Sequence, residues 1–251
     1  EYESYVLEVL SQIDPDNLSE EDQLNYRLLK SDYEISLEGR EYPGYYMRLN
    51  QRGGVQDYYL YGNRLNFTDL QSYKNWFERV KGYTQNVRNS LEINKEGLEL
   101  GYTQPKLVTR GVSAQIGAML ERDLEDHPYF KIFKNVGDVA SPEDALALQN
   151  EVKEYIQNDL NPTYQELYDF LINEYLPESR DTIGISDVPN GKEWYEYLAR
   201  YHTTTNLTPD EIHEIGLREV AKIRAEMEGI IEQVGWEGDF RSFLEHLRTD
   251  P

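Results

Sequence analysis

Apolar residues recur three and four positions apart through most of this chain, and proline or glycine interrupts the pattern at intervals. Side chains at this spacing share one face of an α-helix, so each such segment predicts a helix with one buried face. The chain is therefore expected to be mainly α, a multi-helix array. Between residues 45 and 67 the pattern changes to tyrosine-rich pieces broken by Gly53-Gly54 and Gly62-Asn63, which favours a small irregular insertion with a β-hairpin.

Capping residues and prolines indicate where the helices begin and end. Ser19 predicts a helix over residues 20–38, with Leu24, Leu28 and either Tyr33 or Ile35 facing inward. Thr68-Asp69 predicts the next start, and a separate helix is expected from about Thr84 to Leu100. Further helices are expected through Val108 to Met119, from Ser141 to about Asn158, from Asn161 to Pro177, over Lys192 to His202, from Pro209 to Gly235 and over Phe240 to Leu247.

The helix that begins at Pro209 is expected to be strongly two-sided. Its inward stripe comprises Val220, Ile223, Met227, Ile230 and Val234, and its outward residues include Arg218, Lys222, Glu226 and Glu228. Such a division is typical of a helix that packs on a neighbour along one face.

A threonine run joins this long helix to the preceding one, in the stretch Tyr201-His202-Thr203-Thr204-Thr205-Asn206-Leu207-Thr208-Pro209. The Thr208 hydroxyl can accept the backbone amide of Glu211, and the Glu211 carboxylate can reach back to residue 208. Proline at the first helical position completes this signal. A long helix is therefore predicted to start at Pro209.

Four residues around this run are candidates for contact with a substrate: Tyr195, His202, Thr203 and Thr204. Hydroxyls and an imidazole can hold a peptide backbone, and a tyrosine can donate a hydrogen bond to an oxyanion. The alternative interpretation is structural, with the threonine hydroxyls satisfying the last carbonyls of the helix and His202 placed favourably near the negative end of the helix dipole. The chain has 21 tyrosines, so a structural role is also open for Tyr195.

The segment from Tyr195 to Gly229, YEYLARYHTTTNLTPDEIHEIGLREVAKIRAEMEG, resembles bacterial proteins of the domain of unknown function 885 family. Weaker similarity extends from about Leu18 to Pro251 and includes the pieces 45–49, 101–105, 161–175 and 184–191. Proteins of this family resemble zinc metallopeptidases of the gluzincin type. The resemblance implies that residues 1–251 are the N-terminal helical portion of a larger peptidase. Its zinc motif would lie beyond residue 251, and its substrate would be a peptide.

No zinc motif is complete within the chain itself. A zinc-binding helix needs two histidines one turn apart, with a glutamate beside the metal-bound water. Of the four histidines, only His213 is followed by a glutamate, and Leu217 occupies the position of the second ligand. No catalytic or metal-ligating residue is therefore assigned here. The chain alone is expected to bind no cofactor and to be inactive, although zinc is implied for the full-length protein.

The charge of the chain narrows its partners. A formal net charge of −22, from 47 acidic and 25 basic residues, would repel the phosphates of a nucleic acid. No apolar run approaches the roughly 20 residues that a bilayer-spanning helix needs. There is no cysteine, which excludes disulfides, thiol catalysis and thiolate metal sites.

Two functional interpretations follow. In the first, this chain is one wall of the peptide-binding cleft of a zinc-dependent hydrolase, completed by a missing C-terminal catalytic part. In the second, it is a non-catalytic helical binding or scaffold module. A self-contained acidic interaction domain is a third possibility. Exported members are common in the family that the chain resembles, which favours the periplasm or cell envelope over the cytoplasm.

Overall fold

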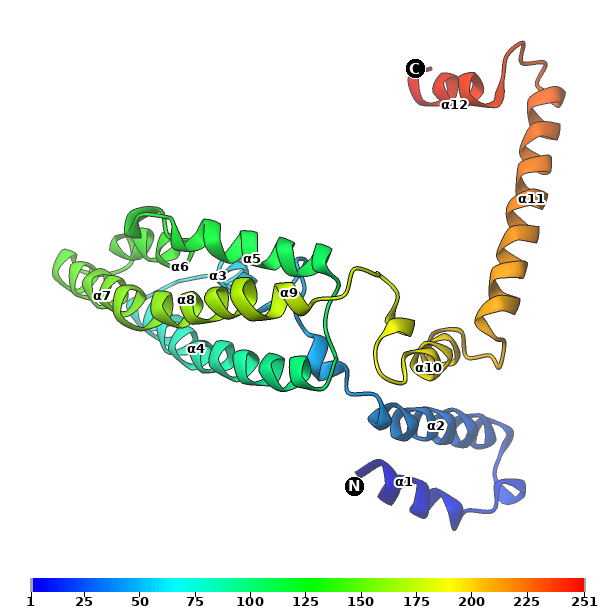
Figure 1. Cartoon of the computed structure of the whole chain (residues 1–251), viewed down its shortest axis with the longest axis horizontal. Helices are drawn as coiled ribbons and strands as arrows, with labels where there is room; N and C mark the ends of the chain where they lie inside the picture. The colour runs from blue at the N-terminus through cyan, green and yellow to red at the C-terminus, as the bar shows by residue number, and fades with distance from the viewer. Residues whose placement is uncertain (1, 251) are drawn as a thin grey trace. The chain divides into compact units, whose positions relative to one another are not determined.

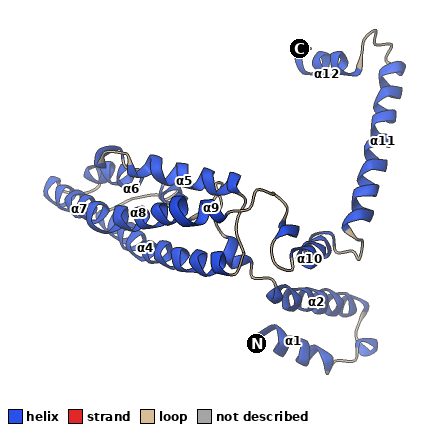
Figure 2. Ribbon diagram, viewed as in Figure 1, coloured by secondary structure: helices blue, strands red, loops and turns tan. Residues whose placement is uncertain are grey.

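The computed structural model describes residues 2–250 and confirms the mainly α fold (Figure 2). Within this range no β-strand forms, and the β contacts amount to an isolated bridge between Pro105 and Arg180. The chain divides into two units. The first, here called the core unit, comprises residues 40–191. The second, called the terminal unit, comprises the described residues of 1–39 and 192–251.

The terminal unit contains helices from both ends of the chain (Figure 1). These are α1 (Tyr2–Ser11), α2 (Glu20–Glu38), α10 (Gly191–Thr203, with the terminal unit from residue 192), α11 (Pro209–Gln233) and α12 (Phe240–Thr249). Helix α2 begins as expected, with the Ser19 hydroxyl accepting the Asp22 amide at 3.2 Å. Within the described residues, no helix has the length and apolar character needed to cross a membrane.

The inward placement of Leu24 and Leu28 is wrong, because these side chains are 50% and 61% exposed. Helix α2 turns a different face towards α1. The Tyr26 hydroxyl donates to the Leu10 carbonyl at 3.3 Å, and the ring of Tyr33 packs edge-on against Tyr2. Because α1 covers the tyrosine face, the leucines of α2 face solvent.

The core unit is a bundle of helices in which α8 contacts both α4 and α5 (Figure 1). Its helices are α3 (Tyr59–Gly62), α4 (Leu70–Glu99), α5 (Lys106–Leu120), α6 (Pro128–Lys131), α7 (Pro142–Tyr155), α8 (Asn161–Phe170) and α9 (Leu176–Glu178). Short 3-10 turns lie at Gly44–Met47, Val55–Asp57, Leu124–Asp126, Ile132–Asp138 and Ile185–Asp187.

The insertion between residues 45 and 67 is irregular, as expected, but the β-hairpin does not form. Two 3-10 turns and α3 occupy this stretch instead. The reason lies in its tyrosines, which pack against a helix rather than a facing strand. The Tyr58 ring stacks on Trp76 and Tyr83 of α4, with centroid separations of 5.4 and 3.7 Å.

Helix α4 is continuous where two separate helices were expected. Its buried stripe runs through Val80, Thr84, Val87 and Leu91 without a change of face. Gly82 lies inside this helix, and its cost of about 1 kcal/mol relative to alanine does not break a helix that packs along its whole length. The start is as predicted, because Asp69 and Ser72 form a reciprocal capping box.

The expected break before Asn161 is replaced by a π turn. Residues Ile156–Leu160 form this turn, and α8 follows directly, with Pro162 in its first turn. A second π turn at Leu171–Tyr175 precedes α9, which contains Pro177. Proline lacks an amide hydrogen and its ring crowds the preceding turn, so a wider turn just before each proline lets the helix continue. The expected end near Pro177 is confirmed at Glu178.

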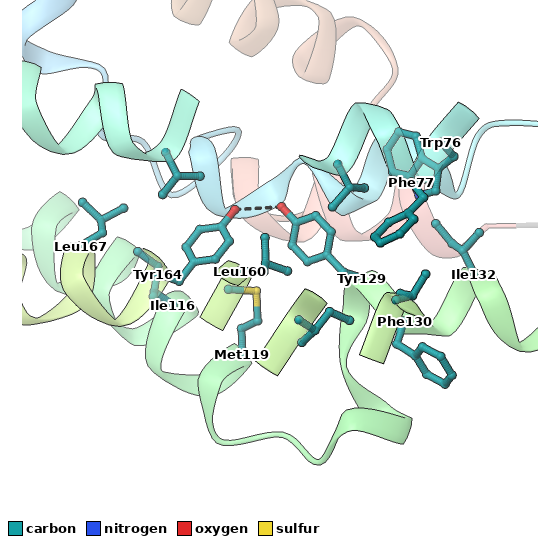
Figure 3. Packing of buried hydrophobic residues seen from close by; sticks show 14 of the residues in the cluster. Trp76, Phe77, Ile116, Met119, Tyr129, Phe130, Ile132, Leu160, Tyr164 and Leu167 are labelled. Atoms are coloured by element: carbon teal, nitrogen blue, oxygen red, sulfur yellow. Dashed lines mark hydrogen bonds between the residues drawn. The ribbon is translucent and has the colours of Figure 1, made fainter. Parts of the chain in front are cut away.

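The hydrophobic core of this unit lies along α8, where Leu160, Tyr164, Leu167 and Leu171 are fully buried. Figure 3 shows these side chains meeting Ile116 and Met119 from α5 and Trp76 and Phe77 from α4. Burying a leucine-sized side chain contributes about 1.5–3 kcal/mol, so this contact line is the main source of stability in the unit.

A chain of buried hydrogen bonds crosses this core. The Tyr164 hydroxyl donates to the Val55 carbonyl at 2.7 Å and lies 2.8 Å from the Tyr129 hydroxyl (Figure 3). A tyrosine hydroxyl carries one hydrogen, so Tyr129 must donate to Tyr164. Burial raises the pKa of both tyrosines. Tyr164 therefore joins α6, α8 and the insertion through two hydrogen bonds.

His127 is the buried titratable group of this core that changes charge near neutral pH. Its side chain has no exposed surface, and neither ring nitrogen has a hydrogen-bond partner. Burial lowers the pKa of His127 to about 4; the nearby Asn161 side chain opposes this shift and the charge of Arg122 adds to it. The folded protein therefore holds this imidazole neutral.

The Tyr129–Tyr164–Val55 chain predicts unequal costs for two similar substitutions. Tyr164→Phe removes both hydrogen bonds and leaves the buried Val55 carbonyl and the Tyr129 hydroxyl unpaired, so it should lower the free energy of unfolding by about 2–3 kcal/mol. Tyr129→Phe removes one bond and should cost about 1 kcal/mol. Urea denaturation measures both, with the half-exposed Tyr195→Phe as control. Equal costs at the two positions would contradict this assignment of donors.

His127 predicts how stability depends on pH. The unfolded imidazole has a pKa near 6.5 and the folded one near 4, so the unfolded state takes up a proton first as the pH falls. Stability should drop by about 1.4 kcal/mol per pH unit below 6.5, until pH 4 is reached. Urea unfolding at pH 7, 6 and 5 tests this. His127→Leu should flatten the curve, whereas the exposed-site variant His202→Gln should retain the wild-type slope; an unchanged slope in His127→Leu would refute the prediction.

Candidate functional site

The predicted cap at the start of α11 is present in full. The Thr208 hydroxyl accepts the Glu211 amide at 3.2 Å, and the Glu211 carboxylate accepts the Thr208 amide at 2.8 Å. These hydrogen bonds from Thr208 lower the pKa of Glu211. The cap fixes the point at which the chain leaves the threonine run, here called the threonine turn (residues 203–205), and begins α11.

Inside the threonine turn the hydroxyls bond to one another and to the backbone. Thr203 Oγ1 donates to the Ala199 carbonyl at 2.7 Å, and Thr204 Oγ1 donates to the Thr203 carbonyl at 2.7 Å. The Thr203 and Thr205 hydroxyls are 2.9 Å apart, and because the Thr203 proton is already used, Thr205 is the donor. All three hydroxyl protons are therefore used locally, and the oxygen lone pairs remain as acceptors.

Thr204 adopts a backbone conformation that is rare for its residue type. Its φ of +55° lies in the left-handed region, where a β-branched residue is strained. Its amide donates to the Arg200 carbonyl at 2.9 Å, the bond that closes a helix when glycine stands just past the end. Threonine thus occupies a position that favours glycine, and strain of this kind often marks functional segments.

A groove runs between α2 and the threonine turn, within the terminal unit. It has a volume of about 880 Å³. Its lining from α2 is Leu28, Leu29, Ser31, Asp32, Glu34, Ile35 and Glu38, and from the other side Arg200, Tyr201, Thr204, Thr205 and Asn206. The volume is within the range of known ligand sites.

The groove brings in one of the four predicted contact residues. Thr204 lines it, whereas Tyr195, His202 and Thr203 do not. The ring of His202 packs edge-on against Tyr201 at 5.1 Å, and Tyr195 is 51% exposed elsewhere on α10. The structure therefore does not assemble the predicted set into one site.

The α2 side of the groove was missed by the sequence reasoning, which assigned Leu28 and Ile35 to a core-facing stripe. These residues lie more than 160 positions before the threonine turn, and no local pattern links the two segments. Their contact is visible in the ion pair between Glu38 of α2 and Arg200 of α10. An apolar stripe interrupted by Asp32 and Glu34 is the signal that the sequence did offer.

The walls of the groove are acidic. Asp32, Glu34 and Glu38 contribute carboxylates, and Arg200 contributes a guanidinium. Lys30 lies 3.8 Å from Glu34 in an exposed ion pair, which contributes little. The groove therefore suits a ligand that carries positive charge and apolar groups.

Metal binding does not fit the residues that are described. Among them, no three histidine, cysteine, aspartate or glutamate side chains come together as metal ligands. His213 and Leu217 lie one turn apart on α11, and leucine cannot ligate zinc. No catalytic step is therefore derived through a metal here.

The strain at Thr204 predicts a stabilising substitution. Thr204→Gly relieves a left-handed conformation that costs a non-glycine residue about 1–2 kcal/mol, partly offset by the greater freedom of unfolded glycine. The net gain should be about 0.5–1 kcal/mol, seen as slower hydrogen exchange of amides in the last turn of α10. Asn190→Gly is the matched control, since Asn190 has a φ of 53° but asparagine tolerates this region. Unchanged or faster exchange in Thr204→Gly would show that residue 204 is not strained.

The family sequence description "Bacterial protein of unknown function (DUF885)" matches residues 1–251. No curated protein matches the chain. A solved structure, the putative lipoprotein from Colwellia psychrerythraea, is similar in fold, with 21% identity and a TM-score of 0.69. The similarity covers 77% of this chain but 34% of that protein, so the chain spans about a third of its length. The chain belongs to the DUF885 family of bacterial proteins.

Proposed function

We propose that this chain is the N-terminal helical part of a zinc-dependent peptidase, in which the groove between α2 and the threonine turn is one wall of a peptide-binding cleft. The zinc motif would lie beyond residue 251. The groove itself is the observation that carries this proposal, because it combines apolar, hydroxyl and charged groups along two facing segments.

The chemistry of the groove supports a peptide as the occupant. Leu28, Ile35 and Tyr201 offer apolar surface for side chains. The threonine oxygens, whose protons are used inside the turn, accept hydrogen bonds and so suit the amide N–H groups of an extended peptide. The acidic walls favour lysine, arginine or a free amino terminus on that peptide.

Zinc and the hydrolytic groups belong, in this proposal, to polypeptide outside the 251 residues. Zinc would there supply an activated water, and the residues of this chain would bind and orient the peptide. The solved relative supports a longer protein, since this chain spans 34% of it.

A non-catalytic binding or scaffold module is the second candidate, and one observation favours it. The hydroxyl protons of all three residues of the threonine turn are used inside the turn, so none is free to polarise a peptide carbonyl. In this alternative the groove would bind a peptide without cleavage.

Peptide binding can be tested on the 251-residue chain by fluorescence anisotropy. A short labelled peptide rich in leucine and lysine should bind more tightly than a matched peptide with glutamate in place of every lysine, and added salt should weaken the binding. Asp32→Asn and Glu34→Gln should each weaken it roughly threefold to fivefold, by removing about 1 kcal/mol of attraction. Glu193→Gln, an exposed change on α10 outside the groove, should have no effect. Equal binding of the two peptides would refute the proposal.

The full-length gene product separates the enzyme from the scaffold. The enzyme predicts stoichiometric zinc, peptide hydrolysis that a chelator abolishes, and a higher KM with little change in kcat for Asp32→Asn. A product that binds the cationic peptide but contains no zinc and cleaves nothing would establish the scaffold interpretation.

A further inference from the structure

The terminal unit buries few apolar side chains. Those that it buries are Leu10, Trp194, Tyr197 and Ile231, whereas every other buried hydrophobic residue of the described chain lies in the core unit. Ordering a residue costs about 1–2 kcal/mol of conformational entropy, which apolar burial has to offset. The helices of this unit therefore need further apolar contacts.

The largest uncovered surface is one face of α11. We call it the α11 stripe and define it as Leu217, Val220, Ile223, Ile230 and Val234, whose exposed fractions are between 50% and 67%. Met227 continues the stripe and is half-buried. The inward stripe expected from the sequence thus exists, but its residues face solvent.

The opposite face of α11 is already satisfied by its own charges. Arg224 Nε lies 2.6 Å from the Glu228 carboxylate, and Lys222 Nζ lies 3.8 Å from the Glu219 carboxylate. Even a long helix gains most of its stability from packing of its apolar face rather than from intrinsic propensity. The α11 stripe is therefore the face that requires a partner.

The spacing of the stripe indicates what shape of partner fits. Val220, Ile223, Met227, Ile230 and Val234 are separated by alternating steps of three and four residues. This is the seam that packs knobs into holes against another helix lying nearly parallel or antiparallel. Glu219 and Glu226 border the seam on one side, so a partner helix with basic residues along that border is complementary.

From these observations we infer that the α11 stripe is the docking surface for an amphipathic helix from the remainder of the longer family polypeptide. The solved relative, of which this chain spans 34%, has the additional length that such a helix requires. A second copy of this chain is a poorer occupant, because two molecules of formal charge −22 repel each other.

The inference rests on the proposed function only in taking this chain as part of a longer polypeptide. It requires neither zinc nor peptide hydrolysis. None of the residues of the α11 stripe lines the groove between α2 and the threonine turn. The docking surface and the peptide site can therefore be tested separately.

The lack of cysteine in the chain makes thiol labelling a clean test. Ile223→Cys places a thiol in the stripe, and Ala225→Cys places one on the exposed opposite face of the same helix. Maleimide labelling, located by peptide mapping, is compared in the 251-residue chain and in the full-length gene product. We expect both thiols to react alike in the 251-residue chain and Ile223→Cys to react at least about tenfold more slowly in the longer product. Val220→Cys is the second stripe variant if Ile223→Cys perturbs folding.

Each remaining outcome overturns the inference. Equal reactivity of both thiols in the longer product, or a gene product that ends at residue 251, leaves the stripe without the proposed occupant. Protection that rises with the concentration of the 251-residue chain would assign the stripe to a second copy. Protection only with anionic lipid vesicles would assign it to a membrane surface. A longer product that protects Ile223→Cys but binds no peptide would retain this inference and refute the proposed function.

Discussion

The burial of one face of α8 is the contact on which the core unit depends. Leu160, Tyr164, Leu167 and Leu171 follow one another along that face at zero exposure, and helices α4 and α5 reach it from different parts of the sequence. The aromatic rings of the irregular insertion close over the same core, so the insertion is held by packing rather than by a sheet. The Tyr129–Tyr164–Val55 hydrogen bonds give this packing a fixed register, because a displaced helix would leave buried polar groups unpaired.

The terminal unit is built on the opposite principle. Its helices are individually well formed, with capping bonds at Ser19, Thr208 and Asp239, yet they bury little apolar surface. Local hydrogen bonds therefore specify where each helix starts without determining what covers it. The groove at the threonine turn and the α11 stripe both follow from this shortage of internal contacts, and both present surface that another polypeptide can use.

Sequence reasoning succeeded where the determining chemistry is local. The starts of α2, α4 and α11 were predicted because the capping residues lie within three positions of the amides they accept. It failed at the insertion, because stacking of Tyr58 on Tyr83 depends on a helix that begins later in the chain. Thr204 could be singled out from its threonine run, whereas Glu38 and Ile35 could not be paired with it before the fold was known. The merging of α7 with α8 was missed because a proline usually signals a helix start, and a π turn cancels that signal.

The two π turns have a consequence for how this helix can change over evolutionary time. A π turn is what an α-helix becomes when one extra residue is accommodated, so Ile156–Leu160 and Leu171–Tyr175 act as phase adjusters between the segments on either side. Residues before and after each adjuster follow separate helical wheels, each aligned with its own neighbours. A single-residue deletion inside an adjuster would rotate everything beyond it by about 100° relative to the preceding segment. Relatives should therefore tolerate substitutions in these two stretches more readily than changes of length.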